Sequence, residues 1–192
     1  MPVVVITPPA YALVSLEEAK AHLRVDFDDD DDYIESLVET VTNTLDGPGG
    51  WLGRALITQT LEWRGDEFGT CDIRLPYPPI ASIVSVKYDD DDGAEQTVSS
   101  GDYRLVGQPS LPRIALAYGS SWPSTRSQSE SVRIRYTAGY GTAVDSVPAP
   151  IRQAVLLMIA ELYENRELTT DRSRAELPFS AMALLSTYRV FA

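Results

Sequence analysis

The segment Ser15-Leu-Glu-Glu-Ala-Lys-Ala-His-Leu-Arg24 and the segment after it, residues 30–45, decide how the fold begins. Ser15 and Glu18 have the spacing of a capping box, in which two side chains satisfy backbone N–H groups of a first helical turn. Apolar residues then recur at helical spacing, which predicts a short amphipathic helix of about ten residues.

Residues 30–45 carry a longer apolar stripe at helical spacing. Its members are Tyr33, Ile34, Leu37, Val38, Val41 and Leu45. This pattern predicts a second helix. The aspartates around its first turn complement the positive end of the helix dipole, and Gly47-Pro-Gly-Gly50 ends it.

A third helix is predicted close to the end of the sequence. Pro148 and Pro150 mark its start, and its apolar face runs to about Asn165. The face consists of Ile151, Ala154, Val155, Met158, Ile159 and Leu162. Residues 166–178 are charged, and Phe179 to Phe191 form a last short amphipathic segment.

Between these helices, apolar and polar residues alternate, as is typical of half-buried strands. Strand-like runs occur at residues 57–64, 72–75, 83–88, 103–106, 113–118 and 131–136. Gly and Pro residues separate the runs, so this part of the sequence predicts a small antiparallel sandwich or barrel.

The order of these elements predicts an α+β fold, with a small helical bundle and an inserted antiparallel β-sandwich or barrel-like domain. None of the three main helices can bury its apolar stripe alone, so we expect the third helix to close a bundle with the first two. We therefore assign residues 1–53 and 148–192 to the helical bundle with a C-terminal tail. Residues 54–147 form the inserted β domain.

The charge of the chain argues against a free-standing nucleic-acid-binding protein. The 192 residues include 28 acidic and 16 basic ones, for a net charge of -12. Eleven of the acidic residues but only two of the basic ones fall within residues 1–53. Affinity for phosphate comes largely from Lys and Arg, which are outnumbered here.

The chain has one cysteine and one histidine, which limits the disulfides, metal sites and catalytic groups that it can form. A single cysteine, Cys71, can form neither an intramolecular disulfide nor a metal site built from cysteines. Because His22 is the single histidine, a mechanism that needs two histidines is excluded. The first residues lack a basic region and contain Pro8 and Pro9, which argues against a signal peptide. No apolar run is long enough to span a bilayer, so we expect no membrane association and synthesis in a reducing cytoplasm.

Two acidic runs invite a comparison with cation sites. The first, Asp28, Asp29, Asp30, Asp31 and Asp32, is either a set of oxygen ligands for a hard cation or, as we favour, a solvated helix start. The second, Asp89 to Asp92, precedes Gly93, but Tyr88 occupies the position where an EF-hand needs an acid. Asp-Gly between two strand-like runs is better explained as a hairpin turn. We therefore predict no metal site.

Catalytic motifs are missing from the sequence. There is no G-x-S-x-G elbow, P-loop or dinucleotide-binding fingerprint, and His22 is better explained as a surface or partly packed residue. Trp63 is expected in the core, whereas Trp122 lies in a loop and is either a packed anchor or part of a carbohydrate platform. We therefore predict a protein that is not an enzyme and uses no cofactor.

Six segments in order resemble the head–tail connector (adaptor, head-completion) family of tailed phages, in its longer form with a β insertion. They are SLEEAKAHLR (15–24) with the acidic helix start, GRALITQT (53–60), LPYPPI (75–80), VRIRYTAGYG (132–141), VPAPIRQA (147–154) and LYENRE (162–167). The resemblance covers roughly residues 13–167. It implies a helical bundle core and a structural role.

The resemblance also implies partners and a location. Such connectors form a ring, generally of twelve copies, beneath the portal protein and extend the channel for DNA, which passes without specific binding. They present a surface to a neck (stopper) or tail-terminator protein. The expected location is the head–tail interface of a virion, assembled in the host cytoplasm.

Two surfaces are candidates for these roles. We hypothesise that Asp28–Asp32 lie on an acidic face that lines or rims the channel and repels DNA phosphates. In the family the C-terminal segment commonly docks on the portal. The tail carries the apolar residues Phe179, Met182, Leu185, Tyr188 and Phe191, which suit helix-in-groove docking. Packing of this tail on its own bundle is the equally weighted alternative.

Two other functions compete with this interpretation. A carbohydrate-binding or hydrolytic accessory domain would expose Trp122 beside converging carboxylates in a cleft. A free-standing oligomeric scaffold would assemble without binding a portal.

Overall fold

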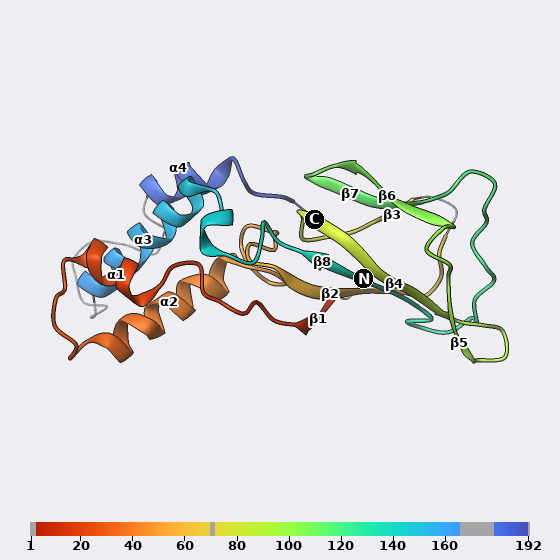
Figure 1. Cartoon of the computed structure of the whole chain (residues 1–192), viewed down its shortest axis with the longest axis horizontal. Helices are drawn as coiled ribbons and strands as arrows, with labels where there is room; N and C mark the ends of the chain where they lie inside the picture. Colours follow the sequence, from red (N-terminus) through yellow and green to blue (C-terminus); the bar gives the residue numbers. More distant parts are fainter. Residues whose placement is uncertain (1–2, 70–71, 166–178, 192) are drawn as a thin grey trace. The chain divides into compact units, whose positions relative to one another are not determined.

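The computed structural model describes residues 3–69, 72–165 and 179–191 and has a mixed α+β fold, as predicted (Figure 1). Its helices are α1 (Leu16–Leu23), α2 (Asp31–Leu45), α3 (Ala149–Glu164) and α4 (Phe179–Ser186), with a short 3-10 helix at Val144–Ser146. Its strands are β1 (Val3–Thr7), β2 (Gln59–Gly65), β3 (Ile73–Arg74), β4 (Ile80–Asp89), β5 (Glu95–Thr97), β6 (Tyr103–Gln108), β7 (Leu111–Leu116) and β8 (Val132–Ala138).

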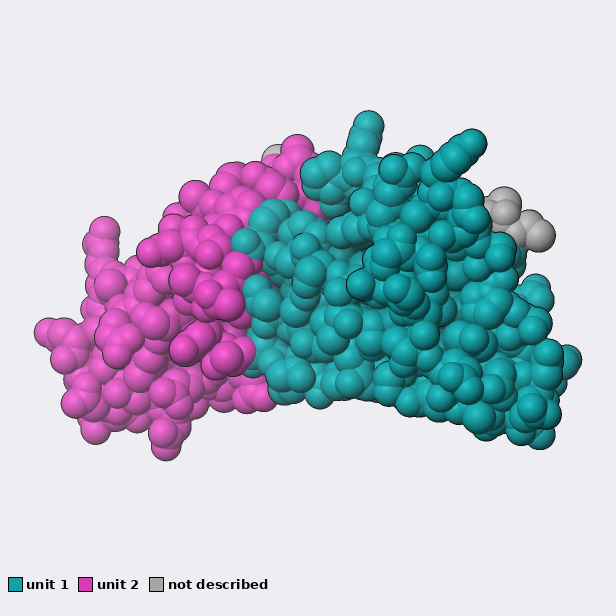
Figure 2. Space-filling model, turned by 45° about the vertical axis from the view of Figure 1, so that its right-hand side comes forward, with its two compact units in different colours: residues 1–9, 58–140, 192 teal, residues 10–57, 141–191 magenta. Residues whose placement is uncertain are grey.

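The chain divides into two compact units, which Figure 2 colours separately. Residues 10–57 and 141–191 make a helical unit, and residues 1–9, 58–140 and 192 make a sheet unit. The boundaries that the sequence predicts lie at 53/54 and 147/148, with residues 1–9 in the helical unit.

In the helical unit, α3 packs against both α1 and α2, so segments distant in the sequence close one bundle as predicted. The Tyr33 hydroxyl donates a hydrogen bond of 3.4 Å to the carbonyl oxygen of Leu162. The Tyr163 hydroxyl donates a short hydrogen bond to the carboxylate of Asp30. These two tyrosines join the start of α2 to the end of α3.

Local sequence signals explain the helices. The Ser15 hydroxyl accepts a hydrogen bond of 3.1 Å from the backbone N–H of Glu18, so one half of the capping box forms at the start of α1. The predicted stripe of α2 is buried at Ile34, Leu37, Val38, Val41 and Leu45. On α3 the buried residues include all the predicted ones except Leu162, which is 39% exposed.

The sheet unit contains one large and one small antiparallel sheet. The large sheet has the strand order β1-β2-β8-β4-β5, and the small one has the order β3-β7-β6. On β8, buried and half-buried residues alternate along the whole strand, which confirms the predicted period of two. Inside this unit, the buried Tyr136 hydroxyl donates a hydrogen bond of 3.0 Å to the carbonyl oxygen of Pro76.

Two strands were not predicted. Residues 3–7 form β1, which pairs antiparallel with β2. Their sequence, VVVIT, lacks the alternation of apolar and polar residues that predicts a half-buried strand. β5 has only three residues, all exposed, and pairs with the end of β4. Among the described residues, no helix combines the length and apolar character needed to cross a membrane.

Candidate functional site

The acidic run ahead of α2 is partly neutralised by one lysine. The ammonium group of Lys20 lies 2.8 Å from a carboxylate oxygen of Asp28 and 2.6 Å from one of Asp31. The hydrogen bond from Lys20 lowers the pKa of Asp28, and the bonds to Asp28 and Asp31 raise the pKa of Lys20. Lys20 therefore connects α1 to the start of α2.

The five aspartates of this run do not share one role. Asp30 is the N-cap of α2 and accepts the hydrogen bond from Tyr163. Asp28, Asp29 and Asp32 are exposed, whereas Asp30 and Asp31 are half-buried. Within the ranges that the structure describes, no group of three or more Asp, Glu, His or Cys residues is arranged to hold a metal ion. The predicted acidic face is thus carried mainly by the three exposed aspartates.

The predicted docking residues of the tail also separate into different environments. Leu185 is fully buried, Tyr188 is half-buried, Met182 is 38% exposed and Phe191 is 72% exposed. The side chain of Phe179 lies outside the described residues. Since α4 packs on α3, part of the tail belongs to its own bundle, whereas the side chains of Met182 and Phe191 remain exposed.

The residues after α4 are held against the loop that follows α2. The Arg54 side chain donates a short hydrogen bond to the carbonyl oxygen of Tyr188. The guanidinium carbon of Arg189 lies 4.2 Å from the centre of the Trp51 ring and 4.7 Å from that of Phe191. An arginine between two aromatic rings gains cation–π attraction to both. No spacing in the sequence predicts this contact, because only the tertiary fold brings Trp51 and Arg189 together.

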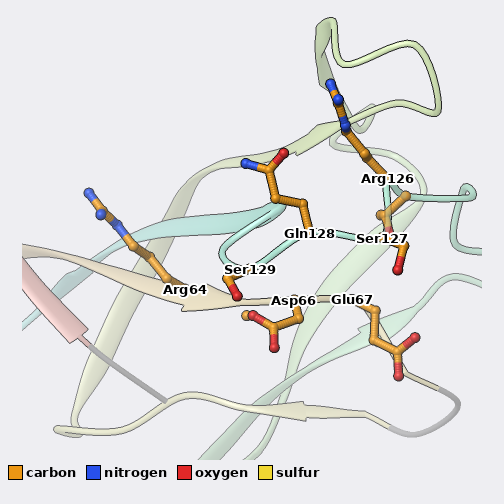
Figure 3. A pocket seen from close by; sticks show the side chains of 9 residues that line it. Arg64, Asp66, Glu67, Arg126, Ser127, Gln128 and Ser129 are labelled. Atoms are coloured by element: carbon orange, nitrogen blue, oxygen red, sulfur yellow. The ribbon is translucent and has the colours of Figure 1, made fainter.

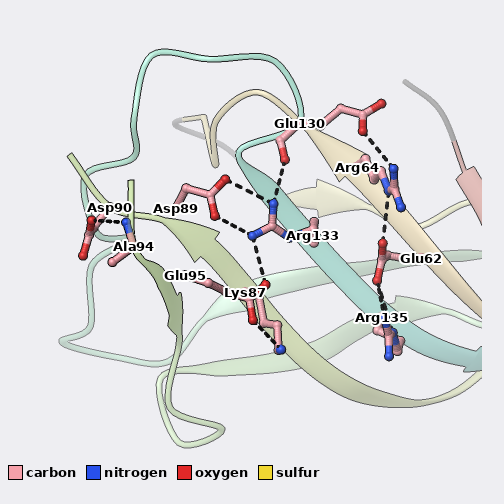
Figure 4. A network of polar contacts seen from close by, with 10 residues as sticks. All are labelled: Glu62, Arg64, Lys87, Asp89, Asp90, Ala94, Glu95, Glu130, Arg133 and Arg135. Carbon is pink, nitrogen blue, oxygen red and sulfur yellow. Dashed lines mark hydrogen bonds and ion pairs between the residues drawn. The ribbon is translucent and has the colours of Figure 1, made fainter. Parts of the chain in front are cut away.

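A network of charged side chains covers one face of the large sheet (Figure 4). Glu62, only 4% exposed, accepts hydrogen bonds of 3.0 Å from Arg64 and 2.7 Å from Arg135. Arg133 lies between Arg64 and Lys87 on the neighbouring strands and pairs with Asp89 through two hydrogen bonds. The network therefore links β2, β8 and β4.

The network shifts the pKa values of its carboxylates. Burial acts to raise the pKa of Glu62, but hydrogen bonds from Arg135 and Arg64 outweigh it and lower that pKa. The hydrogen bonds from Arg133 lower the pKa of Asp89. Glu62 thus remains a carboxylate well below neutral pH, which suits an ion pair rather than a proton donor.

The described residues also form an open pocket of about 730 Å³ in the sheet unit (Figure 3). Its wall consists of Arg64, Gly65, Asp66, Glu67, Thr125, Arg126, Ser127, Gln128 and Ser129. Figure 3 shows Asp66 and Glu67 diverging rather than pointing at a common centre.

Other residues singled out in the sequence have structural roles. Trp63 is buried in the core as predicted. Trp122 stacks on the buried Phe68 with ring centres 4.5 Å apart, so it is a packed loop anchor. The Asp90 carboxylate accepts hydrogen bonds from the backbone N–H groups of Asp92 and Ala94 in the β4–β5 hairpin, which confirms a turn there. His22 is half-buried on α1.

Comparison with known proteins identifies similar chains. Residues 13–63 match the family described as "Phage gp6-like head-tail connector protein". A search of curated proteins finds no match.

Solved structures match over the whole chain. A chain in "Neck of empty GTA particle computed with C6 symmetry" has a TM-score of 0.79 and 27% identity, and the match covers 100% of this chain and 97% of that one. Chains in "Virion of native gene transfer agent (GTA) particle" and "Neck of native GTA particle computed with C12 symmetry" have TM-scores of 0.70 and 26% identity, with the same coverage. The match between sequence segments and the match between folds point to the same kind of protein.

Proposed function

We propose that this member of the head–tail connector proteins is a structural adaptor in the neck of a tailed phage or phage-like particle. The observation that carries the proposal is the match of the entire chain to a particle-neck protein, combined with the connector-family match at residues 13–63. The role is structural and not enzymatic. The charged network of the sheet and the open pocket fit this role because neither has the geometry of a catalytic site.

The adaptor assembles as a ring, with twelve copies as the expected number, at the head–tail interface beneath the portal. Relatives that match the whole chain come from necks computed with C6 and C12 symmetry, which supports a cyclic arrangement. The neck (stopper) or tail-terminator protein binds the opposite side of the ring. DNA passes through the channel without specific binding.

Portal docking uses the exposed surface at the C-terminal end of the helical unit. Trp51, Arg189 and Phe191 form an aromatic–arginine–aromatic stack there, and Met182 adds an exposed apolar side chain. Interface hot spots are enriched in Trp, Tyr and Arg. Because the stack is held together before binding, little conformational entropy is lost when it contacts a partner.

The acidic N-terminal surface faces or rims the DNA channel. Asp28, Asp29 and Asp32 are its exposed members in the run before α2. A negative wall repels the phosphates of passing DNA and prevents it from adhering.

Cosedimentation with the portal protein of the same particle tests the proposal. The chain should migrate with the portal in a density gradient, and the Phe191→Ala variant should reduce the bound fraction by tenfold or more. Ser180→Ala, on an exposed residue of α4, is the control and should leave binding unchanged. A chain that never migrates with the portal contradicts the proposed function.

A further inference from the structure

The strand β1 forms one edge of the large sheet, with a register irregularity between Val5 and Thr7. It consists of Val3-Val-Val-Ile-Thr7 and, among the described strands, pairs only with β2. Val4, Val5 and Ile6 are 36%, 40% and 37% exposed. Proteins usually guard such an edge with charges or proline, because its free N–H and C=O groups can pair with another strand. β1 contains neither a charge nor a proline.

A second stretch of open edge lies on β4. This strand pairs with β8 from Ile80 to Tyr88, but β5 covers its other side only at Lys87–Asp89. The carbonyl oxygen of Val86 accepts a hydrogen bond from Val98. Among the described strands, none pairs with the outer side of residues 80–85, and Val84 is 55% exposed. This open stretch of β4 has register irregularities between Ile80 and Ser82 and between Ile83 and Ser85, and its length is similar to that of β1.

The directions of the strands make these two edges compatible. Every neighbouring pair from β1 through β2 and β8 to β4 is antiparallel, and Figure 1 shows the four strands side by side. β1 and β4 therefore run in opposite directions. If a second copy is placed beside the first in the same orientation, its β1 meets the open edge of β4 as an antiparallel neighbour. The same β1 would be parallel to β5, and parallel pairing is slightly weaker.

We propose that β1 of one copy adds to the open edge of β4 in the next copy, so that the large sheet continues from subunit to subunit. The inference rests on the proposed ring function. It joins two different surfaces, which is the heterologous contact that a cyclic ring requires. Main-chain hydrogen bonds supply affinity, and the exposed valine and isoleucine side chains become covered.

Cysteine cross-linking of the assembled protein tests this contact. In a Cys71→Ser background, Val5→Cys and Val84→Cys are combined, and the assembly with portal protein is oxidised. Facing residues of antiparallel strands have Cα distances that a disulfide can bridge. Placing the first cysteine at Val4 or Ile6 in further variants covers the neighbouring registers. We expect a ladder of covalent oligomers larger than dimers in at least one register.

The single-cysteine variants distinguish the alternatives. Each should give no cross-link, because the proposed contact brings two different strands together. Dimers from Val5→Cys alone would indicate β1–β1 pairing and would overturn the inference. Cross-linking to the portal protein in place of a second copy would also overturn it. Rings that form on the portal without any ladder would refute the strand contact and leave the proposed function standing, whereas the absence of rings would refute both.

A lysine introduced on the open edge of β1 or β4 tests the contact independently, with the yield of rings as the readout. Val4→Lys should lower the yield of portal-bound rings by at least tenfold, and Val84→Lys should act in the same way from the other edge. Leu105→Lys is the matched control, since Leu105 is 37% exposed but lies in the small sheet. Circular dichroism must show the same folding for all three variants. Equal ring yields from Val4→Lys and the control would contradict the inference.

Discussion

The backbone N–H of Val190 donates a hydrogen bond of 2.9 Å to the carbonyl oxygen of Leu52. This bond joins the last described residues of the chain to the loop after α2. The side chain of Arg54 reaches the carbonyl oxygen of Tyr188 from the same loop. Residues 52–54 therefore bind the backbone of the C-terminal segment, and we call them the cradle. The exposed stack of Trp51, Arg189 and Phe191 depends on this contact.

The cradle predicts a specific requirement for glycine at position 53. Gly53 has a φ of +62°, and a Cβ there would collide with the carbonyl oxygen of Val190. We expect Gly53→Ala to lower the free energy of unfolding by about 2 kcal/mol. It should also weaken portal binding. Urea unfolding measures the first effect, and cosedimentation measures the second.

Gly49→Ala is the control for this substitution. Gly49 also has a positive φ, of +94°, but no atom lies within 4 Å of its Cβ position. We expect Gly49→Ala to lower the free energy of unfolding by about 1 kcal/mol through backbone strain alone and to bind the portal normally. Equal losses of binding in both variants would show that the cradle has no special role.

Two apolar residues of the tail should respond differently to truncation. Leu185 is fully buried, so Leu185→Ala removes core contacts and should cost about 3 kcal/mol of unfolding free energy. Phe191 is largely exposed, so Phe191→Ala should cost less than about 1 kcal/mol and act mainly on portal binding. Thermal unfolding beside cosedimentation separates the two effects. A Phe191→Ala variant that unfolds as readily as Leu185→Ala would place this residue in the core.

Acid should weaken the sheet unit through Glu62. Because its pKa is lowered in the folded protein, the carboxylate stabilises the fold above the pKa of an unfolded glutamate. That contribution is lost as the pH falls through the lower folded value. Glu62→Gln should cost about 2 kcal/mol at pH 7 and make stability less dependent on pH below about 4.5.

Glu95→Gln serves as the matched control, because Glu95 pairs with Lys87 and Arg133 but half of its side chain is exposed, whereas Glu62 is buried. Urea unfolding at pH 7 and pH 4 should show little change in this variant. If the stability of Glu62→Gln depended on pH as strongly as that of the wild type, the proposed effect of Arg64 and Arg135 on Glu62 would be contradicted.

The acidic surface before α2 should influence DNA movement. Asp29→Asn with Asp32→Asn removes two exposed charges and spares Asp30 and Asp31, which contact Tyr163 and Lys20. Particles carrying this double variant should assemble normally but eject DNA more slowly, because the channel wall repels phosphate less. The effect should be larger at low salt.

The control variant removes two negative charges from the sheet unit instead of from the surface before α2. Glu67→Gln with Asp92→Asn changes two exposed acidic residues of the sheet unit. This variant should eject DNA at the wild-type rate. If both double variants slow ejection equally, net charge rather than the surface before α2 controls the movement of DNA.

The sequence predicted the elements whose signals are local. The capping box at Ser15 and the apolar stripe of α2 depend on spacing within one helix, and both appear in the structure. The alternation on β8 is equally local. The packing of α3 on α1 and α2 followed from a simple requirement, since an amphipathic helix must bury its apolar face.

The features that escaped prediction depend on contacts between distant residues. β1 is stabilised by pairing with β2, more than fifty residues away, and its own sequence has no alternation. Glu62 is buried at a position where alternation predicts exposure, because Arg64 and Arg135 neutralise it. The tail residues Leu185 and Phe191 belong to one apolar pattern, yet only the packing of α4 on α3 separates the core residue from the exposed one.

Electron cryo-microscopy of the chain bound to its portal protein tests the central claim most directly. The account predicts a closed ring of this chain, expected to have twelve copies, attached to the portal with the residues around Phe191 at the contact. Density that shows scattered single copies, or a ring that contacts the portal through another surface while Phe191 faces solvent, would contradict it.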